Sequence, residues 1–359
     1  RAFDFAVPFR KFGALGYATA EETALSVSQP SGTVCKGPYC RRRFVEWART
    51  TYGGLGNLNR QWATQFKTWE EIEGLRWEDG ARELKNPSRW IDFRMFMETV
   101  VADMHREFIS NIRKADPGAY CGFNCAPYGV NPFHGVNRPL LGKDANFSIE
   151  YQPAWLEDRG ISTSLELLID SSPHMKVGFW LGYNYMDLDP DRYWFKTWWM
   201  AFRQQYGPFM YTLSNDPSTY AKYDYVKMHP TFAPNAFTFL SRDITHNLAR
   251  GVGKLLLNYE RQVDIGIYFS RASMMRNYYE ANQPGNPSFS QWDVRKMLRE
   301  EGFDYRRVTD RQLLDGSAKL YKLVVLPDVT ALGGWRVESA DRVCVFGGNG
   351  AWFCPDRNC

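Results

Sequence analysis

The 359-residue sequence lacks several features that would assign it to a familiar class. It has no apolar run near the roughly 18–20 residues of a bilayer-spanning helix, so we expect no membrane as a partner. It has no G-x-G-x-x-G, G-K-S/T or H-E-x-x-H motif, so nothing predicts a bound nucleotide or a zinc-protease site. It also lacks a repeat of 20–50 residues and any low-complexity segment, which argues against a solenoid or a linker.

Charge of one sign is not in excess either. The 44 Lys and Arg residues and the 40 Asp and Glu residues are interspersed, and the compact basic cluster is Arg41-Arg42-Arg43. This balance disfavours nucleic acid as a partner.

Cysteine is present in an odd number, seven, at irregular spacing, so no disulfide framework follows. Cys35, Cys40, Cys121 and Cys125 could supply four thiolates to zinc, but their intervals are longer than those of the usual C-x2-C knuckles. We therefore expect reduced, partly buried thiols, no metal and no cofactor.

The sequence is rich in aromatic residues, which make up 16% and include 13 Trp and 20 Tyr. Trp and Tyr suit flat amphipathic ligands such as sugars, so this excess favours a carbohydrate ligand. The length predicts a folded chain of about two domains.

Residues 1–260 alternate long helical patterns with short β-rich runs, which is typical of repeated βα units around a parallel sheet. Strands are expected at 14–19, 120–123, 146–149, 176–181 and 208–213. Helices are expected over 38–52, from Ser88 until Asp116, over 193–202 and over 235–257. Five units are too few to close an eight-stranded barrel, so this region is interpreted as a partial (β/α)8 TIM barrel.

Residues 261–359 show a different, compact α/β pattern. Strands are expected over 263–269, 305–308 and 322–327, with a helix over 291–301 and a last β-like run at 351–353. The pattern predicts a flavodoxin-like domain, truncated at its C-terminal end.

Two adjacent carboxylates, Glu21 and Glu22, follow the first expected strand. In a barrel the C-terminal strand ends hold the catalytic groups, and a Glu in a semi-apolar pocket can deliver a proton to a leaving oxygen. By spacing alone, a solvated first helical turn is the alternative.

A longer set of motifs points to one family. The sequence has Y-A-T-A-E-E-T-A-L at 17–25, F-V-E-W at 44–47, Y-G-G-L-G-N-L-N-R-Q-W-A-T-Q-F at 52–66 and D-F-R-M-F at 92–96. These strings resemble the stretch after the fourth barrel strand in glycoside hydrolase family 42 β-galactosidases. The I-Y-F-S-R-A-S string at 267–273 is similar to the start of the family's trimerisation domain. The resemblance spans nearly the whole chain and is weakest over 150–230.

This resemblance implies a glycoside hydrolase that acts on a β-linked galactoside or a related plant or algal saccharide through paired carboxylates. It implies Glu22 as the acid/base, with Glu21 at the family's Asn or Asp position. The family's nucleophile is a Glu ending the seventh strand, but residues 179–185 hold no carboxylate. Glu150 and Asp187 are therefore the candidates for the second catalytic carboxylate, and the alternative for both is a hydrogen-bonding role.

Other residues are expected to contact the sugar. Asn124 ends the second expected strand, and Tyr151, Trp180, Tyr183 and Tyr185 offer rings on which a pyranose face can stack. A non-catalytic carbohydrate-binding or assembly protein with a degenerate site is the alternative function, because the seventh-strand Glu is absent.

The resemblance further implies a homotrimer, and it implies that the sequence is a fragment cut at both ends that lacks part of the barrel. Outside the site, Trp194, Trp198 and Trp199 share an expected helix and are assigned to the core. Glu166 is expected on a helix face with a structural role.

Overall fold

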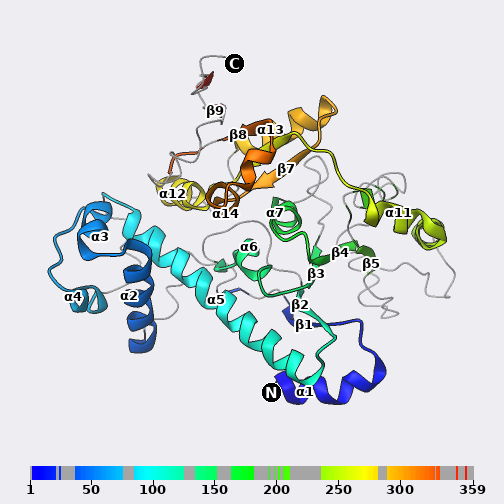
Figure 1. Cartoon of the computed structure of the whole chain (residues 1–359), viewed down its shortest axis with the longest axis horizontal. Helices are drawn as coiled ribbons and strands as arrows, with labels where there is room; N and C mark the ends of the chain where they lie inside the picture. The colour runs from blue at the N-terminus through cyan, green and yellow to red at the C-terminus, as the bar shows by residue number, and fades with distance from the viewer. Residues whose placement is uncertain are drawn as a thin grey trace, which may run out of the picture.

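The computed structural model of the chain has two parallel β-sheets, a short antiparallel pair of strands, and surrounding helices (Figure 1). It describes residues 2–21, 24–25, 37–75, 85–124, 134–151, 163–181, 194, 198, 201–202, 204, 206–210, 236–281, 289–327, 329–331, 345–346 and 352–353. Within these residues no helix is both long enough and apolar enough to cross a membrane. The expected α/β class is confirmed.

The first sheet has five parallel strands, and each strand pairs with the next one along the chain. They are β1 (Gly16–Glu21), β2 (Tyr120–Asn124), β3 (Phe147–Tyr151), β4 (Lys176–Leu181) and β5 (Tyr206–Met210). All five lie at or within a few residues of the expected positions. The main difference is that β1 continues to Glu21, so this residue belongs to the strand.

Close packing of β2 against β3 requires glycine at position 122. A Cβ added to Gly122 would lie 1.6 Å from the carbonyl oxygen of Phe147, far inside contact distance. The absent side chain therefore permits this pairing, which holds the ends of β2 and β3 in register.

Helices cover this sheet and extend beyond it. They are α1 (Ala2–Phe9), α2 (Pro38–Tyr52), α3 (Leu55–Trp62), α4 (Trp69–Glu73), α5 (Ser88–Ala115), α6 (Arg138–Leu141) and α7 (Thr163–Ser171). The expected bounds of α2 and α5 are confirmed. Pro38 begins α2, and Gly53, with a φ of 66°, ends it, because glycine tolerates the left-handed region.

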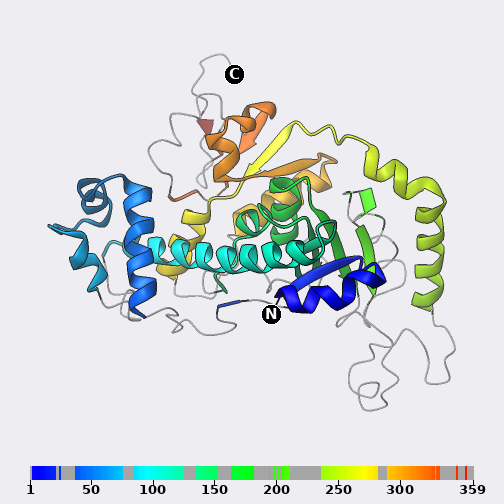
Figure 2. The same ribbon diagram turned by 60° about the horizontal axis from the view of Figure 1, so that its bottom comes forward.

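The long helix α5 connects two cores (Figure 2). Its C-terminal half packs on the sheet, where Val101, Ile109 and Ile112 are buried with Cys121 and Phe123 of β2. Its N-terminal part packs against α2 and α3 through aromatic residues. These are Phe44, Trp47, Trp62, Phe93 and Phe96.

The second sheet has three parallel strands in the order β7-β6-β8. They are β6 (Ile265–Tyr268), β7 (Tyr305–Val308) and β8 (Leu323–Val325), accompanied by α12 (Arg271–Ala281), α13 (Phe289–Glu300) and α14 (Asp310–Leu314). The expected final β run forms β10 (Trp352–Phe353), which pairs antiparallel with β9 (Val345–Phe346) in a separate two-stranded sheet.

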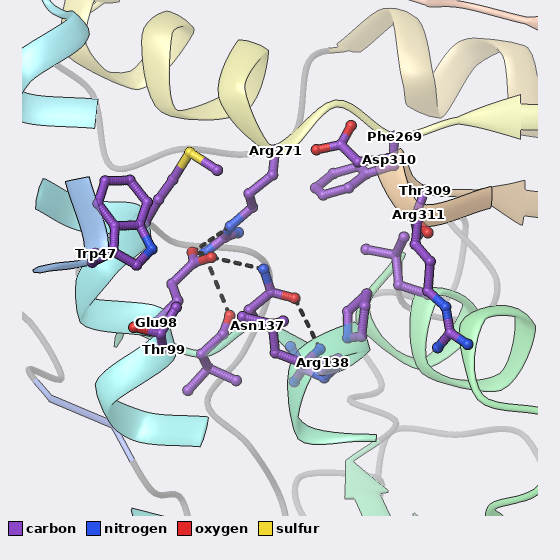
Figure 3. A pocket seen from close by; sticks show the side chains of 15 residues that line it. Trp47, Glu98, Thr99, Asn137, Arg138, Phe269, Arg271, Thr309, Asp310 and Arg311 are labelled. Atoms are coloured by element: carbon purple, nitrogen blue, oxygen red, sulfur yellow. Dashed lines mark hydrogen bonds and ion pairs between the residues drawn. The ribbon is translucent and has the colours of Figure 1, made fainter. Parts of the chain in front are cut away.

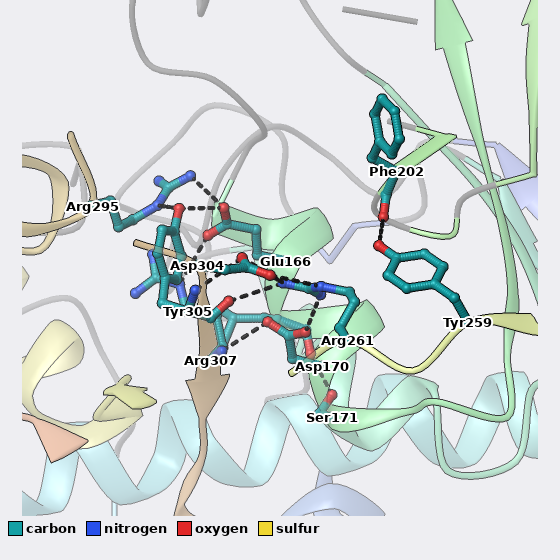
Figure 4. Close-up of polar contacts among 11 residues, drawn as sticks. Glu166, Asp170, Ser171, Phe202, Tyr259, Arg261, Arg295, Asp304, Tyr305 and Arg307 are labelled. Carbon is teal, nitrogen blue, oxygen red and sulfur yellow. Dashed lines mark hydrogen bonds and ion pairs between the residues drawn. The ribbon is translucent and has the colours of Figure 1, made fainter. Parts of the chain in front are cut away.

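Buried ion pairs join α7 to the second sheet (Figure 4). Glu166 of α7 accepts a hydrogen bond from Tyr305 Oη at 2.8 Å, and it contacts Arg295 at 2.9 Å and Arg307 at 3.1 Å. Asp170, one turn later, accepts a hydrogen bond at 2.7 Å from the backbone N–H of Arg307. Glu166 therefore lies on a helix face with structural contacts, as expected.

Three sequence-based expectations are wrong. The helix over 235–257 is interrupted, because α10 (Ala236–Asn247) and α11 (Gly253–Asn258) are separated by a π-helical turn with Gly251 at a φ of 130°. Trp194 is 48% exposed rather than in the core, although Trp198 packs against the first core. Cys40 is disulfide-bonded rather than reduced, while Cys121 is a free, buried cysteine.

Candidate functional site

The carboxyl ends of the parallel strands form one edge of the first sheet. Glu21 pairs in register with Asn124, and Asn124 pairs with Ile149 of β3. Tyr151, the last residue of β3, pairs in turn with Trp180 near the end of β4. Four predicted site positions, those of Glu21, Asn124, Tyr151 and Trp180, thus lie at this edge.

A register shift in β1 produces the first of these pairs. Ala18 pairs with Gly122, but Glu21, three residues later, pairs with Asn124, only two residues later in β2. The extra residue in β1 is the mark of a β-bulge, a feature that is frequent beside functional sites.

The remaining predicted residues are only partly described. Glu22, Tyr183, Tyr185 and Asp187 lie outside the described residues. For Glu21, Tyr151 and Trp180 the strand position is described but the side chain is not. The predicted roles of these seven residues stay predictions.

Glu150 of β3 is the predicted catalytic candidate whose surroundings are described in full. Its side chain is buried, lies 3.3 Å from the guanidinium of Arg138, and accepts a hydrogen bond from Ser148 Oγ at 3.1 Å. Burial raises the pKa of the Glu150 carboxyl, while Arg138 and Ser148 oppose this shift.

The face of the sheet on which the Glu150 side chain lies follows from the alternation of side chains along β3. Ser148 and Glu150 lie on the same face of β3, and Ser148 pairs in register with Phe123 and Val177. Phe123 and Val177 belong to the core beneath α5, so Glu150 lies on the helix-covered face of the sheet. This placement favours the hydrogen-bonding alternative for Glu150 over a role at the reacting bond.

A second polar cluster was missed by the sequence analysis. Glu98 of α5 accepts a hydrogen bond from Asn137 Nδ2 at 2.7 Å and forms an ion pair with Arg271 at the start of α12. Both charged side chains are buried, and Figure 3 shows the three residues converging. The I-Y-F-S-R-A-S string includes Arg271, but no local pattern indicates its partner 173 positions earlier.

The described residues offer no group of three or more His, Cys, Asp or Glu side chains that could hold a metal ion. Cys40 is disulfide-bonded, so its sulfur is not available as the thiolate that zinc binds.

A row of parallel strands whose carboxyl ends bear an acid, an amide and aromatic residues has the layout of (β/α)8-type enzymes. Residues 24–152 match the Beta-galactosidase profile of glycoside hydrolase family 42. The predicted resemblance to this family of glycosidases is thereby confirmed. A comparison with curated proteins gives no match.

Solved structures of family members share the fold. The chain is similar to the β-galactosidase from the psychrophilic Marinomonas ef1, with a TM-score of 0.68 and 13% identity over 96% of this chain and 57% of that chain. It is similar to the exo-carrageenase of family 42 from Bacteroides ovatus, with a TM-score of 0.68 and 13% identity over 99% and 54%. It is also similar to the cold-adapted β-galactosidase from Rahnella sp. R3, with a TM-score of 0.65 and 14% identity over 99% and 56%. The chain thus spans little more than half the length of each.

Proposed function

We propose that the protein is a glycoside hydrolase that acts on a β-linked galactoside or a related saccharide. The observation that supports this most directly is the register of β1, in which Glu21 ends the strand beside Asn124 at the carboxyl edge. Glu22 follows Glu21 directly, and the family match begins two residues later. An acid at this edge is in the position that barrel enzymes use for catalysis.

In this proposal Glu22 protonates the departing glycosidic oxygen and later activates water. Glu21 and Asn124 bind sugar hydroxyls, and Tyr151, Trp180, Tyr183 and Tyr185 provide stacking surfaces. Asp187 is the preferred second carboxylate, because Glu150 is already bound to Arg138 in the interior.

The second candidate function is a non-catalytic carbohydrate-binding or assembly protein. It is favoured by one specific feature of β4, whose residues Lys176–Leu181 contain no carboxylate where the family has its nucleophile. The pairing of Glu150 with Arg138 also favours the non-catalytic function, because Glu150 is then no longer a candidate to replace the family's nucleophile.

We also propose the domain organisation implied by the resemblance. Residues 1–260 form the C-terminal part of a glycosidase (β/α)8 barrel, which the sequential order of β1 to β5 supports. Residues 261–359 form a flavodoxin-like domain of the trimerisation type, supported by the central position of β6 between β7 and β8. A homotrimer is the assembly proposed from the resemblance.

The test compares the full gene product with its Glu22→Gln, Glu150→Gln and Asp187→Asn variants on aryl β-galactosides. We expect Glu22→Gln to lower kcat by roughly 10²–10⁴-fold on a substrate whose leaving group needs protonation. Glu107→Gln, at an exposed position of α5, is the matched control and should keep full activity. Retained turnover in Glu22→Gln would remove the acid/base assignment. Galactoside binding without any turnover by the wild type would support the non-catalytic alternative.

A further inference from the structure

A cavity of about 270 Å³ lies between the helices of the first sheet and the second sheet (Figure 3). We refer to it as the interface cavity. Its walls come from α2, α5, α6 and α7 on one side, and from the segments after β6 and β7 on the other. Asn124, at the carboxyl edge of the first sheet, is not among the described residues that line it.

The walls of the interface cavity are mainly apolar, and two are aromatic. Trp47 lies at one side and Phe269 at the other (Figure 3), and aliphatic residues such as Val136 and Leu140 belong to the rest of the lining. A ring with apolar faces gains contact area from such walls.

Hydrogen-bonding groups accompany these apolar walls. The carboxylates of Glu98 and Asp310, the amide of Asn137 and the hydroxyl of Thr99 belong to residues that line the interface cavity. A few polar groups among apolar walls are typical of sites for small molecules.

Each of the three arginines that line the interface cavity is paired with a carboxylate of the protein. Arg271 forms an ion pair with Glu98, Arg138 with Glu150, and Arg311 with Asp315. The first two pairs are buried. An anion would therefore have to compete with carboxylates already in place, whereas a neutral ligand would leave these pairs intact.

The location of the interface cavity in the fold also favours ligand binding. In open sheets of parallel strands, ligands bind outside the carboxyl ends of the strands. Phe269 directly follows β6, and Thr309 directly follows β7, so the interface cavity lies at this end of the second sheet.

We propose that the interface cavity is a second ligand site, which binds one neutral, hydroxyl-bearing ring of monosaccharide size. Its volume is just below the roughly 300–1,000 Å³ typical of pockets for drug-sized ligands, so it suits a single ring rather than an oligosaccharide. The ring faces pack between Trp47 and Phe269, and the hydroxyl groups bond to Glu98, Asn137 and Thr99. The proposal does not depend on Glu22 or on catalysis.

The test follows the methyl group of Met95, which lines the interface cavity, by NMR of the full protein labelled with ¹³C-methyl methionine. D-galactose is titrated as the neutral ring and sodium sulfate as the anion, and the Met95 signal is assigned with Met95→Leu. Met104, also on α5 but exposed and outside the cavity lining, is the internal control. We expect galactose to produce a saturating shift at Met95 and no shift at Met104.

Two variants localise the binding. Leu140→Trp fills the interface cavity and should abolish the galactose shift, while the other methionine signals report whether the variant is folded. Thr99→Val keeps the side-chain shape and removes one hydroxyl, so it should weaken binding about fivefold. Glu22→Gln should bind at Met95 as the wild type does, which separates this result from the test of the proposed catalytic function.

Three outcomes would overturn the proposal. They are an unmoved Met95 signal at saturating galactose, a saturable shift with sulfate alone, and a galactose shift that survives in both Leu140→Trp and Thr99→Val.

Discussion

Arg307 of β7 donates a hydrogen bond from Nε to the Glu166 carboxylate of α7, 3.1 Å away, with both side chains fully buried. Arg295 contacts the same carboxylate, so one acid compensates two guanidinium groups. Burial lowers the pKa of Arg307 and Arg295 lowers it further, while Glu166 opposes both effects. The buried Glu166 carboxylate thus joins α7 to the second sheet. Its removal would leave two guanidinium groups buried without this counter-charge.

Glu166→Gln should lower the free energy of unfolding by about 3–5 kcal/mol, because it leaves Arg295 and Arg307 buried without a counter-charge. Urea denaturation measures the change. Glu300→Gln is the control, since its ion pair with Lys296 is exposed, and we expect a loss of no more than about 0.5 kcal/mol. Equal losses in the two variants would contradict the importance of the Glu166 cluster.

We expect a similar loss of stability when the Glu150–Arg138 pair at the first sheet is broken. Arg138→Met should destabilise the protein by about 3–5 kcal/mol, because the Glu150 carboxylate is then buried without its partner. The double variant Arg138→Met/Glu150→Gln should recover part of this loss, since no unpaired charge remains. A double-mutant cycle by chemical denaturation measures both effects, and strictly additive losses would show that the two residues are not coupled.

Asp92 should make stability depend on pH. It accepts hydrogen bonds from Tyr52 Oη at 2.5 Å and Trp62 Nε1 at 2.6 Å, and burial raises the pKa of its carboxyl from 3.8 to about 6. The folded state therefore binds the proton more tightly than the unfolded state does. This contribution is fully present below pH 4 and is lost as the pH rises to about 6.

Asp92→Asn removes this dependence, because an amide oxygen accepts the same bonds without charge. Relative to the wild type, we expect the variant to gain on the order of 3 kcal/mol between pH 4 and pH 7. Urea denaturation of both proteins at several pH values measures the difference. A difference that does not change with pH would disprove the proposed titration.

The contribution of His105 to stability has the opposite pH dependence. Its Nδ1 lies 2.6 Å from Thr19 Oγ1, and burial lowers the pKa of its ring from 6.5 to about 4. The folded state favours the neutral ring, so the contribution to stability is present above pH 6.5 and is lost as the pH falls toward 4. NMR of the ring nitrogens should show a neutral His105 at pH 5.5, and the wild type should lose stability relative to His105→Asn over this range. A ring protonated with a midpoint above pH 6 would refute this assignment.

Local patterns in the sequence located many elements and part of the site. Pro38 and Gly53 mark the ends of α2, and Asp116 follows the last residue of α5. Glu21 and Asn124 were expected just after their strands, and in the structure they are the last residues of β1 and β2. Helix α12 (Arg271–Ala281) was not predicted from the sequence.

The sequence by itself determined the parallel α/β class, the positions of most strands and the family resemblance, because these depend on neighbouring residues and fixed periodicities. Only the tertiary structure decided that Glu150 faces Arg138 beneath the helices, and that Glu98 and Arg271, 173 positions apart, meet at a cavity. The physical reason is that a buried charge is stabilised by whichever partner the packing brings near, and distance along the chain does not limit that choice.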